Sequence, residues 1–175
     1  MILPDSPAVL AAFERDMKNV HVRYEYEGQP DMETGKSERW RYEIWFHSAD
    51  RVVYAIHDGP LAGRFNYQKA DYQCIREGEL WQCNWHEETG SVFSIVYDIP
   101  NKRLTGLLGL SKGHATQPEL ARGDKRNPDD LARWWKLSEV GKQTERHMIS
   151  DQVDVVESFF GSGSLDDIDL NASTL

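Results

Sequence analysis

The stretch "ELWQCNWHEETG", Glu79–Gly90, alternates between two kinds of side chain until it reaches a glycine. Trp81, Cys83 and Trp85 share one phase, and Glu87 continues the same phase. Because successive side chains of a β-strand point to opposite faces, this period of two predicts a strand with one apolar, inward face. The glycine then predicts a turn.

Segments of the same kind lie on both sides of this stretch, separated by Gly, Asp, Asn or Pro. We predict strands at 19–27, 38–47, 51–58, 62–67, 69–76, 79–87, 90–98, 102–110 and 152–160. Short strands at this spacing are typical of an antiparallel sandwich or barrel. About eight or nine strands can close around a cavity that holds one small ligand.

Two helices are predicted to flank the strands. Residues 7–18 carry apolar side chains at helical spacing behind a possible cap at Ser6. Residues 127–140 begin with Asn127 as the N-cap, followed by a proline, which is typical of a first helical position. Residues 161–175 have the composition of a flexible tail.

The chain of 175 residues, 1–175, has the length of a single domain. Its net charge of −9 argues against nucleic-acid binding, which needs a clustered basic surface. No apolar run approaches the ~18 residues of a membrane-spanning helix. Pro4 and Asp5 interrupt the apolar segment that a signal peptide would need, so we expect no membrane contact and a cytoplasmic protein.

Tyrosines occur on the phase that we expect to face the barrel interior. In "NVHVRYEYEG", residues 19–28, Tyr24 and Tyr26 share the phase of two valines. Tyr42 has the same position in the apolar phase of the next strand. Three inward phenols would give a polar lining, although inward tyrosines are more often core residues with a satisfied hydroxyl.

Two adjacent glutamates end the strand quoted above. Glu87 lies on the inward phase, where burial would favour a neutral carboxyl suited to a general acid. Glu88 lies on the opposite phase and is expected to be solvated at the turn. The alternative for Glu87 is an ordinary solvated residue at a hairpin.

One arginine and the histidines complete the set of candidate groups. Arg64, near the expected rim of the barrel, could bind a carboxylate with its planar fork, and the alternative is a surface salt bridge. The histidines show no ligand spacing, so we expect no metal site. They are His21, His47, His57, His86, His114 and His147.

Together these segments resemble the phenolic acid decarboxylases. The resemblance rests on "YEY" (24–26), "WRYEIWF" (40–46), "VYAIHDGPLAGR" (53–64), "QKAD" (68–71), "EGELWQCNWHEETG" (77–90) and "DIPNKRLTG" (98–106). The family consists of lipocalin-like (calycin-type) β-barrel enzymes that form homodimers and need no cofactor. Its members convert 4-hydroxycinnamic acids to 4-vinylphenols and carbon dioxide. In this chain the segment 27–39 is longer than in the bacterial members.

The resemblance implies a site and a mechanism. The implied catalytic residues are Tyr24, Tyr26, Arg64 and Glu87, and the implied substrate-binding residues are Tyr42, Tyr54, Trp85 and Asp151. The substrate class would be phenolic acids such as p-coumaric, ferulic and caffeic acid. Glu87 would protonate the alkene carbon that bears the carboxylate, giving a quinone methide. The competing hypothesis is a non-catalytic lipocalin-like binder of small aromatic ligands.

Overall fold

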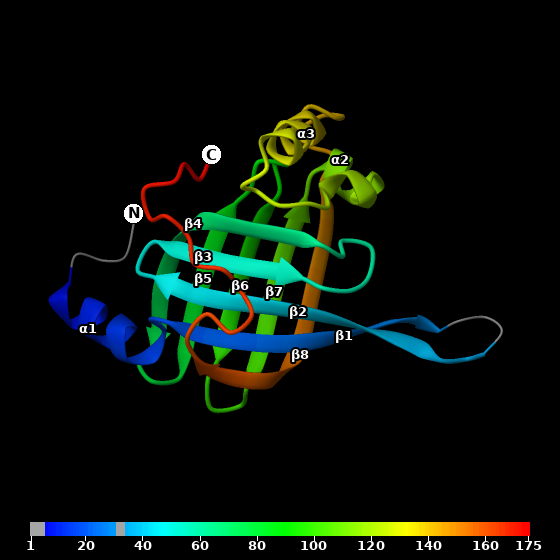
Figure 1. The fold of residues 1–175 in the computed structure, drawn as a ribbon. Coiled ribbons are helices and arrows are strands. Elements are labelled where there is room, and N and C mark those ends of the chain that lie inside the picture. Colours follow the sequence, from blue (N-terminus) through cyan, green and yellow to red (C-terminus); the bar gives the residue numbers. More distant parts are fainter. Residues whose placement is uncertain (1–5, 31–33) are drawn as a thin grey trace.

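The computed structural model describes residues 6–30 and 34–175. Eight antiparallel strands form a closed barrel in which each strand pairs with the next along the chain, and the last returns to pair with the first (Figure 1). The strands are β1 (Val20–Pro30), β2 (Ser37–Ser48), β3 (Arg51–Ile56), β4 (Arg64–Arg76), β5 (Leu80–His86), β6 (Val92–Asp98), β7 (Arg103–Leu110) and β8 (His147–Phe160). The predicted mainly β, antiparallel barrel is confirmed.

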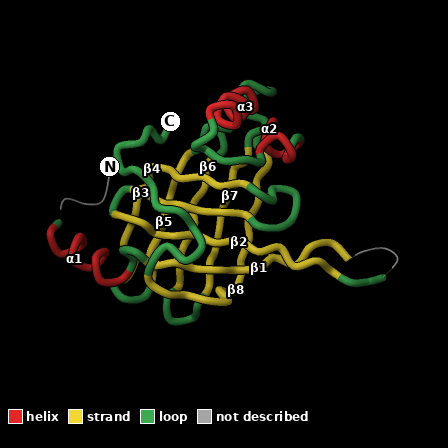
Figure 2. Tube along the Cα trace, in the orientation of Figure 1, coloured by secondary structure: helices red, strands yellow, loops and turns green. Residues whose placement is uncertain are grey.

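Helices cover both ends of the barrel. Helix α1 (Pro7–Asp16) lies at one end, and α2 (Lys112–Thr116), the 3-10 turn η1 (Pro118–Ala121) and α3 (Pro128–Ser138) lie at the other (Figures 1 and 2). The two predicted helices are present with slightly shorter bounds. Helix α2 and η1 were not predicted, because so few residues leave no helical periodicity to detect. Among the described residues, no helix is both long and apolar enough to cross a membrane.

Strand β4 corrects the prediction of two separate strands at 62–67 and 69–76. It is continuous, and it pairs with β3 up to Lys69 and with β5 from Ala70 onward. One long strand therefore turns a corner of the barrel, and its 13 residues exceed the usual ~5 to 6. Strand β8 does the same, because it pairs with β7 up to Asp154 and with β1 from Val155. Residues 6–30 and 34–175 therefore form eight strands, within the expected eight or nine.

The long connection predicted at 27–39 is largely a hairpin. Strand β1 runs on to Pro30 and β2 begins at Ser37, and the two project beyond the barrel (Figure 1). A register shift between Glu27 and Pro30 marks where the hairpin departs from the regular ladder. Residues 31–33 at its tip, and residues 1–5, on which the signal-peptide expectation rested, lie outside the described residues.

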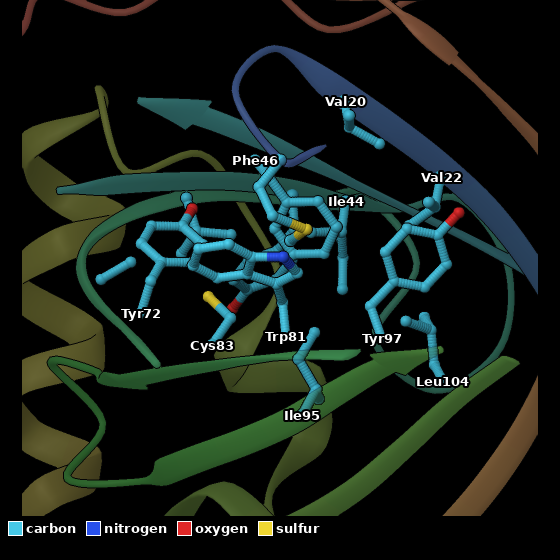
Figure 3. Packing of buried hydrophobic residues seen from close by; sticks show 14 of the residues in the cluster. Val20, Val22, Ile44, Phe46, Tyr72, Trp81, Cys83, Ile95, Tyr97 and Leu104 are labelled. Carbon is cyan, nitrogen blue, oxygen red and sulfur yellow. The ribbon is translucent and has the colours of Figure 1, made fainter. Parts of the chain in front are cut away.

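Apolar side chains fill the half of the barrel that α1 covers. Phe13 of α1 is fully buried and packs against Tyr72 and Trp81, at ring-centroid distances of 4.7 and 5.8 Å. Phe46 and Tyr97 stack beside them at 5.9 Å (Figure 3). Of these residues, Trp81 and Phe46 lie on the apolar strand phases expected to face inward. With this half filled, open space inside the barrel is left toward α2 and α3.

The C-terminal segment, predicted as a flexible tail, lies against the outside of the barrel. Leu165 is only 6% exposed and packs in an apolar cluster with Trp45, Val53 and Tyr67. The segment crosses the outer face of β2 and β3 (Figure 2). Because the outward side chains of these strands include large apolar groups, covering them removes apolar surface from water and holds the segment in place.

This cover also buries a carboxylate on the outward phase of β2. Glu43 is 1% exposed and accepts hydrogen bonds from His21 Nε2 at 2.8 Å, His57 Nε2 at 2.6 Å, Arg23 Nε at 3.2 Å and Ser164 Oγ at 2.6 Å. Burial alone would raise the pKa of Glu43, but the hydrogen bonds outweigh it and lower the pKa to about 2. Glu43 therefore joins the C-terminal segment to the barrel as an anion.

We predict that Glu43→Gln lowers the free energy of unfolding at neutral pH by about 1 to 3 kcal/mol, because a buried acceptor loses its charge. A depressed pKa stabilises the fold fully above the ordinary value of 4.5, and this stabilisation is lost as the pH falls through about 2. The difference between wild type and variant, measured by urea unfolding, should shrink over that range. Glu157→Gln, at an exposed partner of Arg23, is the control. A difference that stays constant with pH would contradict the assignment.

Candidate active site

A cavity of about 530 Å³ occupies the half of the barrel that faces α2 and α3. This volume suits a small organic ligand. Its lining includes Tyr24, Tyr26, Tyr42, Tyr54, Arg64, Trp85 and Asp151. These are all of the predicted site residues except Glu87, which lies directly behind Tyr54 and Trp85 and is fully buried.

The barrel strands place these side chains by their period of two. Tyr24 and Tyr26 come from β1, and Tyr42 and Tyr54 lie on the inward phases of β2 and β3. Arg64 is the first residue of β4. Trp85 comes from β5, Glu87 follows that strand directly and Asp151 comes from β8. Neighbouring strands therefore bring residues that are distant in sequence to one wall.

Three donors converge on the Glu87 carboxylate. Oε1 accepts from the Tyr54 hydroxyl at 2.5 Å and from Trp85 Nε1 at 3.0 Å, and Oε2 accepts from Arg64 Nη2 at 2.8 Å. The prediction that Glu87 points inward and is buried is confirmed. Its surroundings are not the apolar pocket that was expected, because hydrogen-bond donors and a guanidinium surround it. All three partners donate, so both carboxylate oxygens act as acceptors in this network.

Arg64 is fixed on every side. Its side chain is fully buried, Nε donates to the Tyr54 hydroxyl at 2.9 Å, Nη1 donates to the carbonyl of Ala121, and Nη2 bonds Glu87. The guanidinium lies 3.9 Å from the ring centroid of Trp134 on α3. Burial lowers the pKa of Arg64, but Tyr54 and Glu87 raise it above its ordinary value, so the group stays charged. The alternative of a surface salt bridge is excluded.

The hydroxyl of Tyr54, a residue of the cavity lining, is bonded to Glu87. It donates to Glu87 and accepts from Arg64 Nε and, at 3.3 Å, from Asn66 Nδ2. Burial, opposed by Arg64 and reinforced by Glu87, raises the pKa of Tyr54 well above its ordinary value. Tyr54 therefore presents a neutral hydroxyl that bonds both members of the buried ion pair.

A second polar group lies on the cavity wall. The rings of Tyr24, Tyr26 and Tyr42 contact one another at centroid distances of 5.1 to 5.6 Å. Burial raises the pKa of all three, that of Tyr42 to about 12, and the negative charge of Asp151 adds to the effect. The three phenols are thus neutral, and each has a hydroxyl suited to bind an oxygen atom.

Glu88 corrects the prediction of a solvated residue at the turn. It is fully buried, forms an ion pair with Lys125 and accepts a hydrogen bond from Gln68 Nε2 at 2.6 Å. Lys125 Nζ also donates to the carbonyls of Tyr67 at 2.7 Å and Thr174 at 2.9 Å. The phase count separated the two glutamates, and in the structure they bond different partners. It could not foresee that the loop before α3 and the C-terminal segment would cover this turn.

Trp134 and His114 are site residues that sequence reasoning missed. Trp134 lies within the predicted helix 127–140 and was given no role, yet it is fully buried against Arg64. His114 lies in α2, which was not predicted, and it lines the cavity while being 2% exposed. The sequence offered one signal for His114, which is its place four residues after the predicted strand 102–110.

We predict strong coupling between Arg64 and Glu87. Arg64→Met leaves the carboxylate buried without its charged partner, which should lower the free energy of unfolding by about 3 to 5 kcal/mol. Combining it with Glu87→Gln should cost less than the sum of the two single changes in urea unfolding. Arg103→Met, in the exposed pair with Asp154, is the control and should cost about 1 kcal/mol or less. Additive losses for Arg64 and Glu87 would contradict the buried pair.

The sequence of this chain is similar to that of a known protein family. The family model described as "Phenolic acid decarboxylase (PAD)" matches residues 31–156, a segment that begins after Tyr24 and Tyr26 and includes Arg64 and Glu87. "Phenolic acid decarboxylase PadC" of Bacillus subtilis (strain 168) is 30% identical over 82 residues, which cover 46% of this chain and 50% of that protein. "Probable phenolic acid decarboxylase" of Vibrio cholerae serotype O1 is 21% identical over 80 residues, 46% of each chain. The chain spans about half the length of these curated relatives. Because the family model covers more than half of the chain, this protein belongs to the phenolic acid decarboxylase family.

Proposed function

We propose that this protein decarboxylates 4-hydroxycinnamic acids, such as p-coumaric, ferulic and caffeic acid, to 4-vinylphenols and carbon dioxide without a cofactor. Membership of the family supports the reaction class. The observation that carries the proposal is the buried network of Arg64, Tyr54 and Glu87 beside a cavity that is large enough for a small aromatic acid.

The reaction needs a proton at the alkene carbon that bears the carboxylate. Electrons from the para-oxygen, which becomes a carbonyl, flow through the ring as that carbon is protonated, and the product is a quinone methide. The bond to the carboxylate then breaks, carbon dioxide leaves, and its electron pair restores the alkene and the aromatic ring. The balance is one proton taken up from solvent for each carbon dioxide released.

In this proposal Glu87 supplies the proton and Tyr54 carries it into the cavity. Glu87 is fully buried, and Tyr54, a residue of the cavity lining, places its hydroxyl 2.5 Å from the carboxylate. When Glu87 is protonated the hydrogen bond reverses, and the Tyr54 O–H turns toward the substrate at the expense of its longer contact with Asn66. The hydroxyl can both donate and accept, so the proton passes without charging the tyrosine.

The group of Tyr24, Tyr26, Tyr42 and Asp151 then binds the phenol end of the substrate. The carbon that accepts the proton must lie beside Tyr54, so the carboxylate lies on that side of the cavity and the para-oxygen lies away from it. Neutral phenols stabilise the negative charge that the para-oxygen carries in the bound phenolate, and Asp151 can accept the phenolic proton.

Homodimer formation and a cytoplasmic location stay predictions.

The relay predicts a contrast between two donors to the same oxygen of Glu87. Glu87→Gln and Tyr54→Phe should each lower kcat for p-coumarate about 10² to 10⁴-fold, since each removes a proton-carrying group. Trp85→Phe removes the other donor to Oε1, but an indole N–H cannot relay a proton, so kcat should fall about tenfold or less. Rates are followed by loss of cinnamate absorbance, with folding verified by circular dichroism. If Glu87→Gln turned over at the wild-type rate, the assignment of Glu87 as the general acid would be wrong.

The quinone methide route predicts that the para-hydroxyl is indispensable. Cinnamate, which lacks it, should bind without being decarboxylated, while p-coumarate and ferulate react with no added cofactor. Product analysis for styrene and 4-vinylphenol distinguishes the two cases. Release of styrene at a comparable rate would exclude the route. Thermal stabilisation by p-coumarate without any turnover would instead favour the non-catalytic binder.

A further inference from the structure

His114 is a buried cavity residue to which the proposed mechanism gives no role. Its side chain lines the cavity, is 2% exposed and lies at the end where Arg64 and Glu87 are held. Nδ1 lies 2.9 Å from Ser91 Oγ and 3.1 Å from Thr89 Oγ1. Nε2, at the other edge of the ring, is buried and has no hydrogen-bond partner among residues 6–30 and 34–175. Buried polar atoms rarely stay unpaired, so we expect a bound ligand to supply the hydrogen-bond partner of this nitrogen.

The hydroxyls beside the ring determine which nitrogen carries the proton. Ser91 Oγ accepts hydrogen bonds from the backbone N–H of Ser111 and from the Thr89 hydroxyl, both at 3.1 Å. Its two acceptor positions are then occupied, and only its own proton is left for His114 Nδ1. With the Thr89 hydroxyl donating to Ser91 Oγ, we assign Nδ1 as the acceptor and place the ring proton on Nε2. The unpartnered atom is a hydrogen-bond donor.

The ring is neutral, so it offers a directed N–H and no net charge. Burial and the nearby charge of Arg64 lower the pKa of His114 to about 3. The turn that carries Thr89 and Ser91 also carries Glu87, whose backbone N–H donates to the Ser91 carbonyl at 2.9 Å. His114 is thereby bonded to the same turn that positions the acid.

We propose that the Nε2–H of His114 binds the carboxylate of the substrate. The inference rests on the proposed function for the identity of the ligand, because protonation beside Tyr54 places the substrate carboxylate at this end of the cavity. A single neutral donor orients the carboxylate by a hydrogen bond and forms no ion pair with it. The carboxylate is therefore positioned for departure as carbon dioxide and is not retained by a full positive charge. His114 is accordingly a binding residue specific for the acid.

Two unreactive ligands test the proposal through binding alone. 3-(4-Hydroxyphenyl)propanoate has both polar ends but a saturated side chain, and 4-ethylphenol has no carboxylate. By calorimetry, His114→Asn, which has no donor at the Nε2 position, should weaken binding of the acid roughly tenfold and of the phenol by about twofold or less. His114→Gln can place an amide nitrogen at the Nε2 position and should retain affinity for the acid within about threefold of wild type.

Each outcome decides the matter. Equal weakening of both ligands by His114→Asn would mean that the ring only supports the fold, and unchanged affinities would mean that it does not touch the ligand. Either result overturns the proposal, and so does a wild-type protein that binds neither compound. If wild type binds both and the variants behave as expected, but p-coumarate is not converted, only the proposed decarboxylation fails.

Discussion

The buried ion pair between Arg64 and Glu87 is the interaction around which this end of the barrel is built. Two charges without access to water need full compensation, and a pair with incomplete hydrogen bonds would destabilise the fold. Here Tyr54 on β3, Trp85 on β5 and the carbonyl of Ala121 in η1 supply the further hydrogen bonds. The ring of Trp134 on α3 adds a cation–π contact to Arg64. The helices at this end therefore help to stabilise the charges as well as to close the barrel.

The same arrangement divides the barrel interior into two halves with different physical roles. At the α1 end, Phe13, Tyr72 and Trp81 fill the space with apolar contacts that stabilise the fold. At the other end, a few polar groups lie among apolar side chains in the wall of a cavity of about 530 Å³. Strands β4 and β8 make this possible, because each is long enough to leave one sheet and join the next. Closure of the barrel then leaves neither half with an exposed strand edge.

The period of two made much of this predictable from sequence. It gave the inward phases of β1, β2 and β5, and with them the burial of Tyr24 and Glu87. It failed where tertiary contacts cover an outward side chain, as at Glu43 beneath the C-terminal segment and at Glu88 beside Lys125. Strand β4 was divided because local alternation does not report where a strand bends. His114 escaped notice because its short helix has no sequence periodicity.

The proposed chemistry follows from one spatial relation: Tyr54 lines the cavity and also donates a hydrogen bond to the buried Glu87. The decisive measurement is a proton inventory of the single-turnover rate with p-coumarate in mixtures of H₂O and D₂O. A relay moves one proton from Tyr54 to carbon and another from Glu87 to Tyr54 in the same step. We therefore predict that the rate falls along a curve that bows downward as the deuterium fraction rises. A straight line, which reports a single transferred proton, would contradict the relay.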